Sequence, residues 1–372
     1  MGKVVSSSSS FVPQAAPMLR IQKFRKEIDS AISRVIGGSY AIRGPEVEAF
    51  EAALAAYCGV SYAIGVGSGT DALFLALRAA GIGPGDEVIT VALTAAGTAQ
   101  AILLTGATPV YVDVDPLSRC MDPGSVVAAI GAKSAAIVPV HLFGHTANMV
   151  EIEKIARRHG LFLLEDCAQA LGARIDDRMS GTFGHAAAIS FYPTKNLGCI
   201  GDGGAVITSD IALAENIRML SNYGWVDSHR ISTAIAGNSR LDELQAAILA
   251  VLLPHLDDGN AMRQNIASRY LASLQDFVVT PTDQPGAVWH QFVIECEDRD
   301  GLAVRLKSEG IGTGVHYHPP LHQQPALAPT SLSPLPNTER LSERFLSLPI
   351  QPEVADIHND SIVNAIKRSV QL

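Results

Sequence analysis

An aspartate and a lysine near the middle of this 372-residue chain are the first residues whose placement suggests chemistry. Asp166 ends the apolar run LFLLED, and Lys195 comes shortly after the apolar run AAAISFY. Ligands of parallel α/β sheets bind outside the carboxyl ends of the strands, where Asp166 would lie. Taken alone, Asp166 could equally cap a helix, and Lys195 could be a solvated loop residue.

A glycine-rich stretch, GVGSGTDAL, supplies a third feature. A turn of this kind between a strand and a helix presents backbone N–H groups to an anion, and the helix N-terminus favours negative charge. Gly65, Gly67 and Gly69 are spaced G-x-G-x-G, whereas a dinucleotide fingerprint has the spacing G-x-G-x-x-G. No convincing acidic ribose ligand follows, since Asp86 and Glu87 precede a strand instead of ending one. A single phosphate therefore fits this stretch better than a dinucleotide.

Together the three features call for a ligand with a phosphate, a group that a carboxylate can hold, and a carbonyl that a lysine can attack. Pyridoxal phosphate has all three. We expect Lys195 to form a Schiff base with this cofactor and Asp166 to keep the ring nitrogen protonated. Because only a neutral amine attacks a carbonyl, burial or neighbouring cations must lower the pKa of Lys195 from the ~10.4 of free lysine.

The elements that would position these residues alternate between strand-like and helix-like runs from about residue 45 to 210. This rhythm is typical of an α/β fold with a mostly parallel sheet and helices on both faces. We expect helices at 47–59, 71–81, 96–105, 148–159 and 241–253, and strands at 63–66, 88–90, 109–115, 134–141, 161–166, 186–192 and 204–208.

A change in composition after Pro254, which should end the helix at 241–253, indicates a second, smaller unit. There we expect strands at 289–297 and 310–318 around a helix at 301–310, and a last helix near 355–370. The predicted organisation is a disordered or loosely ordered N-terminal segment (1–25), a large cofactor-binding domain (26–254) and a small C-terminal α+β domain (255–372).

The composition narrows the class of protein. A net charge of −9 without a long basic run is unsuited to nucleic acid, because such binding depends on Lys and Arg neutralising phosphates. The five cysteines form no C-x-x-C pair and are odd in number, which favours a reducing, cytoplasmic compartment. No apolar run approaches the ~20 residues of a membrane span, so no membrane partner is expected. The serine-rich start also lacks the apolar core of a signal peptide.

With these residues in place, the chain resembles the DegT/DnrJ/EryC1/StrS family of sugar aminotransferases over nearly its whole length. The matching stretches, in order, are GPEVEAFEAALAAYCGV, GSGTDALFLAL, GATPVYVDVDP, HLFGHTANM, LLEDCAQALGA, ISFYPTKNLG, GDGGAVIT and GNSRLDELQAAIL. The resemblance implies fold type I of the pyridoxal-phosphate enzymes, with a mostly parallel seven-stranded sheet in the large domain. It also implies a homodimer whose subunits share their active sites.

The resemblance implies roles for individual residues as well. Lys195 matches the Schiff-base lysine, Asp166 the partner of the ring nitrogen, and Gln169 a residue near the cofactor's 3-hydroxyl. Asn238 matches a phosphate contact donated by the other subunit. The implied phosphate cradle consists of Ser68, Gly69, Thr70 and Ser190. Many members stack an aromatic residue on the cofactor ring, but the stretch TAAGT has Ala95 at that position.

Lys195 stands where the dehydratases of the family have a histidine, so the resemblance implies transamination. L-Glutamate would convert the cofactor to pyridoxamine phosphate, which would then aminate a keto-sugar. The stretches NSRLDELQAAIL and GIGTGVHYHPP are most similar to the branch that acts at C-3 of nucleotide-linked 3-keto-6-deoxyhexoses, so a dTDP-linked sugar is expected. No metal ion is expected. The candidate substrate contacts are Tyr192, His290, His316, Tyr317 and His318.

Three alternatives stay open at this point. An inosose or other cyclitol ketone could replace the nucleotide sugar as acceptor. The scaffold could also be an aminodehydroquinate-type synthase or a dehydratase, or a cofactor-binding regulatory protein without turnover. Stoichiometric formation of 2-oxoglutarate from L-glutamate would separate transamination from the other reactions.

Overall fold

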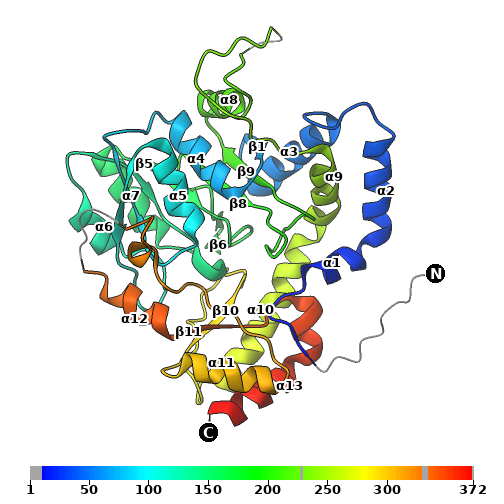
Figure 1. The fold of residues 1–372 in the computed structure, drawn as a ribbon, viewed down its shortest axis with the longest axis vertical. Helices are drawn as coiled ribbons and strands as arrows, with labels where there is room; N and C mark the ends of the chain where they lie inside the picture. The colour runs from blue at the N-terminus through cyan, green and yellow to red at the C-terminus, as the bar shows by residue number, and fades with distance from the viewer. Residues whose placement is uncertain (1–10, 227–228, 329–333, 371–372) are drawn as a thin grey trace.

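A seven-stranded sheet with the strand order β1-β9-β8-β5-β4-β2-β3 forms the centre of the molecule (Figure 1). The computed structural model describes residues 11–226, 229–328 and 334–370. Strand β9 runs antiparallel to both of its neighbours, and every other neighbouring pair is parallel. This confirms the predicted mostly parallel sheet. The strands are β1 (Tyr62–Val66), β2 (Glu87–Val91), β3 (Thr108–Val112), β4 (Ser134–Val138), β5 (Phe162–Asp166), β8 (Ala186–Ser190) and β9 (Gly204–Thr208).

Helices cover both faces of the sheet, and successive strand residues alternate between the apolar clusters on the two faces. Ile64 and Leu164 pack with the helices of one face, whereas Ala63 and Leu163 pack with those of the other. Strands buried on both faces read as near-continuous apolar runs, which is why they were visible in the sequence. The first face carries α4 (Gly69–Ala79), α5 (Ala96–Thr105) and α8 (Ile211–Leu220); the second carries α3 (Pro45–Cys58), α6 (Pro123–Ala129), α7 (Met149–His159) and α9 (Glu243–Leu252), with α2 (Arg25–Ile36) packed on α9.

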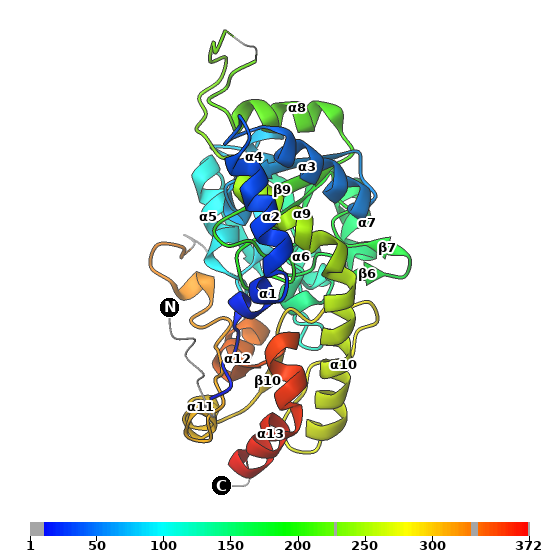
Figure 2. The same cartoon turned by 90° about the vertical axis from the view of Figure 1, so that its right-hand side faces the viewer.

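A second cluster of elements lies below the sheet in Figure 1, built around the antiparallel pair of β10 and β11. The long helices α10 and α13 pack on one another beside this pair, and α11 packs on α13 (Figure 2). The elements are α10 (Leu256–Leu274), β10 (Phe292–Glu295), α11 (Arg299–Ser308), α12 (Pro336–Arg344), β11 (Phe345–Leu348) and α13 (Pro352–Val370). Short elements complete the chain: η1 (Leu142–Gly144), β6 (Arg174–Ile175), β7 (Arg178–Met179), η2 (Leu253–His255) and η3 (Leu321–Gln323).

Two expectations for the C-terminal part need correction. Residues 310–318 form no strand but two single bridges, Ile311 with Val12 and Gly314 with Ser347 of β11, because glycines weaken the pairing of this stretch. Pro254 ends α9 as expected, but the chain continues through η2 directly into α10, which the sequence analysis missed. The boundary at 254 between two domains stays a prediction.

The N-terminal segment is better ordered than expected where the structure describes it. Residues 1–10, which include the serine run, lie outside the described residues. Pro17–Lys23 form helix α1, so the expectation of a loose segment is wrong for these residues. Buried Ile21 packs in a core of the sheet part, and buried Val12 packs in the core around β10 and β11. These contacts explain why this segment is ordered. Within the described ranges, no helix has the length and apolar character needed to cross a membrane.

Candidate active site

A cavity of about 410 Å³ opens at the carboxyl end of the sheet, where β5 and β8 end and α4 begins. Its volume lies within the ~300–1,000 Å³ of small-molecule sites. Most of the predicted site residues meet here. The predicted residues that line it are Ser68, Gly69, Thr70, Asp166, Ser190, Tyr192, Lys195, His290, His316 and Tyr317.

Asp166 is buried at the carboxyl end of β5, with 4% of its surface exposed. Burial raises the pKa of its carboxyl group above the usual value, while two hydrogen bonds lower it. Thr98 Oγ1 donates to Asp166 Oδ2 at 2.9 Å, and the backbone N–H of Ala168 donates to Oδ1 at 3.1 Å. The nearby Lys195 also favours the charged carboxylate. The site therefore holds a carboxylate that is oriented from two sides.

Lys195 lies in the loop after β8 and is half-buried, since part of its side chain lines the cavity. Burial lowers the pKa of its amine from 10.5 to about 8, and Asp166 partly opposes this shift. The predicted requirement for a lowered pKa is thus met by burial. A lysine of this kind is partly neutral near neutral pH, which nucleophilic attack on a carbonyl requires.

The start of α4 and the end of β8 form a narrow anion cradle. Ser68 is the N-cap of α4, and its Oγ accepts from the backbone N–H of Asp71 at 3.1 Å. Gly69 approaches β8 so closely that a Cβ there would lie 2.7 Å from the Cβ of Ser190. Only glycine allows this approach, which brings the N-terminal amides of α4 and the Ser190 hydroxyl to one wall of the cavity. The donor set and the helix end suit one phosphate group.

Gln169 is buried behind the cavity and connects two of its walls. Its Oε1 accepts from the backbone N–H of Phe143 at 2.7 Å, and its Nε2 donates to the hydroxyl of Tyr317 at 2.9 Å. Burial raises the pKa of Tyr317 to about 12, so this hydroxyl keeps its proton near neutral pH. Gln169 is therefore placed behind the Tyr317 side of the cavity.

The ring of His290 is held in one tautomer by its neighbours. Asn196 Nδ2 donates to Asn260 Oδ1 at 2.8 Å and to the carbonyl of Val288 at 3.0 Å, so Asn196 Oδ1 is an acceptor. His290 Nδ1 lies 3.2 Å from this oxygen and must carry the proton. Burial and then the charge of Lys195 lower the pKa of His290 well below the usual value. The imidazole is neutral, and its unprotonated Nε2 is available as an acceptor.

Besides Gln169, two predicted residues do not line the cavity among the residues that the structure describes. His318 turns to α12, where its Nδ1 lies 3.0 Å from Ser342 Oγ, so it does not line this cavity, and its contact with the substrate stays a prediction. Asn238 is exposed and bridges the backbone of Asn222 after α8. His316 does line the cavity, with its Nδ1 2.7 Å from Ser347 Oγ, and burial lowers its pKa to about 4.

Sequence reasoning missed two residues at this site. Thr98 lies in the first turn of α5, 68 positions before its partner Asp166, and no local pattern connects them. Arg20 of α1 contacts the loop that carries Lys195, although this part of the chain was expected to be loose. Ala95, noted in the sequence, does lie in the cavity wall.

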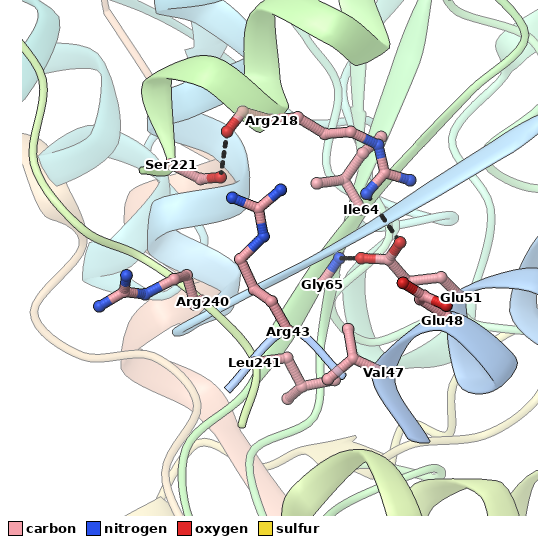
Figure 3. Close-up of a pocket in the computed structure, with 10 residues that line it drawn as sticks. All are labelled: Arg43, Val47, Glu48, Glu51, Ile64, Gly65, Arg218, Ser221, Arg240 and Leu241. Atoms are coloured by element: carbon pink, nitrogen blue, oxygen red, sulfur yellow. Dashed lines mark hydrogen bonds and ion pairs between the residues drawn. The ribbon is translucent and has the colours of Figure 1, made fainter. Parts of the chain in front are cut away.

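A second cavity lies between α3, α8 and β1 and is drawn in Figure 3. Arg43 and Arg218 point toward it, whereas Arg240 lines it but turns its guanidinium away, to Asn222 Oδ1 at 2.9 Å. Arg218 forms an ion pair of 2.8 Å with Glu51, whose other oxygen accepts from the backbone N–H of Gly65 at 2.7 Å. The predicted site residues are all absent from the described residues that line it, so this cavity is separate from the candidate active site.

His141, Glu165 and Cys167 lie close enough together to be considered as metal ligands. Glu165, however, already accepts from His141 Nε2 at 3.0 Å and from the backbone N–H groups of Gly181, Phe183 and Gly184. A carboxylate with four donors is committed to holding this turn beside β5. The cluster supports the strand end that carries the neighbouring Asp166.

Comparisons with known proteins agree with this geometry. The chain is 46% identical over 361 residues to the erythromycin biosynthesis sensory transduction protein EryC1 of Saccharopolyspora erythraea, covering 94% of this chain and 98% of that one. It is 45% identical over 355 residues to a dTDP-3-amino-3,4,6-trideoxy-alpha-D-glucose transaminase of Streptomyces venezuelae, covering 93% of each. The crystal structure of S. venezuelae DesV in complex with a ketimine intermediate matches with a TM-score of 0.94 and 43% identity, over 97% of this chain and 99% of that one.

A family model describes almost the whole chain. The model of the DegT/DnrJ/EryC1/StrS aminotransferase family matches residues 22–367, which include every predicted site residue and both parts of the fold. The resemblance noted in the sequence is thereby confirmed. The chain belongs to the DegT/DnrJ/EryC1/StrS aminotransferase family.

Proposed function

We propose that this protein is a pyridoxal-phosphate-dependent aminotransferase that moves an amino group from L-glutamate to a nucleotide-linked keto-sugar. The proposed acceptor position is C-3 of a dTDP-3-keto-6-deoxyhexose. The observation that carries the proposal is the meeting of Lys195, Asp166 and the anion cradle in one cavity. A reactive amine, a buried carboxylate and a helix N-terminus at these places suit the aldehyde, the ring nitrogen and the phosphate of this cofactor.

Each residue has a proposed task in this reaction. The cofactor supplies an aldehyde for amine exchange and a ring that withdraws electrons from the reacting carbon. Ser68, Gly69, Thr70 and Ser190 hold the phosphate, and Asp166 holds a proton on the ring nitrogen. Gln169 lies on the side of the cavity proposed for the 3-hydroxyl. Lys195 binds the cofactor covalently and, once released, moves a proton at the reacting carbon.

The proposed substrate rests on the cavity and on the relatives. The S. venezuelae transaminase is named for a dTDP-linked 3-amino sugar. In this chain, His290 and His316 are neutral imidazoles and Tyr317 is a neutral phenol, all at the cavity wall. Neutral donors and acceptors of this kind suit sugar hydroxyls. A tenfold preference for one nucleotide sugar needs only ~1.4 kcal/mol, about one such hydrogen bond.

We further propose a cytoplasmic homodimer with shared sites. The segment that follows α8 projects beyond the sheet in both views (Figures 1 and 2). Its exposed apolar side chains include Val226, Ile231 and Ile235, which are 68%, 62% and 95% exposed. Exposed apolar groups on a projecting segment favour contact with a second subunit. Asn238 lies near the base of this segment, where it could serve the partner's phosphate site. Ala95 leaves the cofactor ring to be covered by another residue.

One experiment tests the amino-transfer step directly. Purified protein is loaded with pyridoxal phosphate, and its absorbance spectrum and the 2-oxoglutarate formed are measured after L-glutamate is added. We expect loss of the yellow band and one 2-oxoglutarate per subunit, with neither in Lys195→Ala. A yellow protein that releases no 2-oxoglutarate would favour a regulatory role, to which the name of the EryC1 relative points. Competition between a dTDP-linked keto-sugar and an inosose then separates the two classes of acceptor.

A further inference from the structure

The side chain of Arg20 reaches from helix α1 into the loop that carries Lys195. Its Nη1 donates to the carbonyls of Lys195 at 2.9 Å and Asn196 at 2.7 Å. Its Nη2 donates to the carbonyls of Pro193 at 3.1 Å and Gly198 at 3.3 Å. One guanidinium thus binds four carbonyls within six consecutive residues. This loop belongs to no strand or helix, so these carbonyls have no ladder of backbone hydrogen bonds to order them.

The loop is closely fitted around the guanidinium. A Cβ on Gly198 would lie 2.9 Å from Arg20 Nη2 and 2.6 Å from the carbonyl oxygen of Pro193. Residue 198 therefore must be glycine for the carbonyls to converge on the arginine. Burial lowers the pKa of Arg20 from its ordinary value, and buried Nε has no hydrogen-bond partner among the described residues. Such a costly burial of a charge is offset by the four acceptors that it binds.

Arg20 is itself held by a segment that is tied to the C-terminal part of the molecule. The backbone of Val12 bonds to the carbonyl of Gly310 and to the N–H of Gly312, both at 2.7 Å. Gln351, buried just before α13, donates to the carbonyl of Ala16 at 2.9 Å and accepts from the N–H of Ala16 at 2.8 Å. These bonds fix the chain immediately before α1. The guanidinium is therefore presented to the loop from a fixed support.

A contact at the cavity belongs to the same segment. Gln14 Nε2 donates to Gln291 Oε1 at 2.7 Å, and Gln291 lines the cavity that contains Lys195. Residues 11–23 thus contact both the lysine loop and a second residue that lines the cavity. We define these residues as the N-terminal strap.

We propose that Arg20 is a positioning residue, which holds the backbone of Lys195 so that its amine faces the cavity, with the N-terminal strap as its support. The inference rests on the proposed function of Lys195 as the covalent attachment point of the cofactor. Four charge-assisted hydrogen bonds restrict the loop before the cofactor arrives, so less conformational entropy is lost on attachment. Arg20 acts through the loop and touches neither cofactor nor substrate.

The test compares the full-length variants Arg20→Met and Arg20→Lys with the control Arg25→Met. Arg25 is an exposed neighbour on α2 whose guanidinium pairs with Asp29 of the same helix and with no other described residue, so its loss should not affect the loop. Hydrogen exchange of the cofactor-free protein is measured on the peptide covering 192–199. It contains the amides of Lys195 and Cys199, which donate to Tyr192 at 2.8 Å and Phe191 at 2.9 Å. The second readout is the rate at which pyridoxal phosphate is trapped on Lys195 by borohydride, measured well below the melting temperature.

We expect Arg20→Met to increase exchange in this peptide and to slow cofactor trapping, each by about tenfold or more. Arg20→Lys should recover part of both effects, because an ammonium can reach some of the carbonyls but cannot span four. Unchanged exchange and unchanged trapping in both variants would overturn the inference. If Arg20→Met does not fold, exchange and trapping in Arg20→Lys are compared with those in Arg25→Met. Equal values in these two variants would then overturn the inference. Absence of trapping on Lys195 in the wild type would instead refute the proposed function, while the exchange data still test the strap.

Discussion

The pKa of Lys195 gives a prediction that needs no cofactor. Burial lowers this pKa from 10.5 to about 8. At pH 7 a pKa of about 8 leaves about a tenth of the amine neutral, and the change from 10.5 increases the neutral fraction by about 300-fold. The neutral amine is the reactive form, so Lys195 should react with amine reagents far faster near neutral pH than a free lysine would.

The assay is competitive labelling of the cofactor-free protein with a small amine reagent at a series of pH values. Mass spectrometry compares the peptide that contains Lys195 with the peptide that contains exposed Lys26, an internal control in the same tube. The labelling rate of Lys195 should rise with pH and level off above a midpoint near pH 8. In Asp166→Asn the midpoint should move to lower pH, because the carboxylate raises the pKa of Lys195 and the amide cannot.

A labelling profile of Lys195 that coincides with that of Lys26 would refute the argument that burial activates the amine. A midpoint near pH 8 that moves upward in Asp166→Asn would refute the stated sign of the carboxylate's effect. Slow labelling with the expected midpoint would report restricted access to the cavity, and a smaller reagent would then be compared. The sign is fixed by the charges, because a negative neighbour always favours the protonated amine.

Two further predictions concern the walls of the cavity. Thr98→Val removes the donor to Asp166 Oδ2, so cofactor affinity should fall about tenfold to a hundredfold. The pH below which cofactor binding is lost should also rise, because the carboxylate is then easier to protonate. Thr105→Val makes the same change elsewhere on α5 and serves as the control, so it should leave the low-pH limit of cofactor binding unchanged. Titration calorimetry across pH measures both variants. His316→Gln should raise the KM for the keto-sugar about threefold to tenfold, whereas His318→Gln should not, since only His316 lines the cavity. Equal effects on KM would place the sugar elsewhere.

The sequence was most informative where one residue's position depends on its immediate neighbours. Asp166 and Lys195 were found because each follows an apolar strand of a parallel sheet, and strand ends meet at one edge. The helix ends were visible for the same reason, as at Gly59, whose positive φ of 71° ends α3. Such signals are local in the chain, so a single sequence contains them.

What was missed depends on contacts between distant parts of the chain. Arg20 lies 175 positions before Lys195, and no pattern in the surrounding residues predicts that its guanidinium binds the lysine loop. His318 was expected beside His316 because the two are neighbours in the sequence, but their side chains bond to different elements, β11 and α12. The expected strand at 310–318 bridges β11 at Gly314 but does not pair with it further, and its other bridge joins Ile311 to Val12, about 300 positions earlier in the chain.

The two charged groups of the site show how one physical effect can serve opposite needs. Burial favours the neutral form of both, so it lowers the pKa of Lys195 and raises that of Asp166. The reaction proposed here needs a neutral amine and a charged carboxylate. The described residues supply hydrogen-bond donors to only one of them: Thr98 and Ala168 stabilise the carboxylate, whereas the amine receives only the weaker opposing influence of Asp166. The two donors therefore oppose the effect of burial on the carboxyl group without cancelling it, since the pKa of Asp166 stays raised, while burial gives Lys195 a neutral fraction near neutral pH.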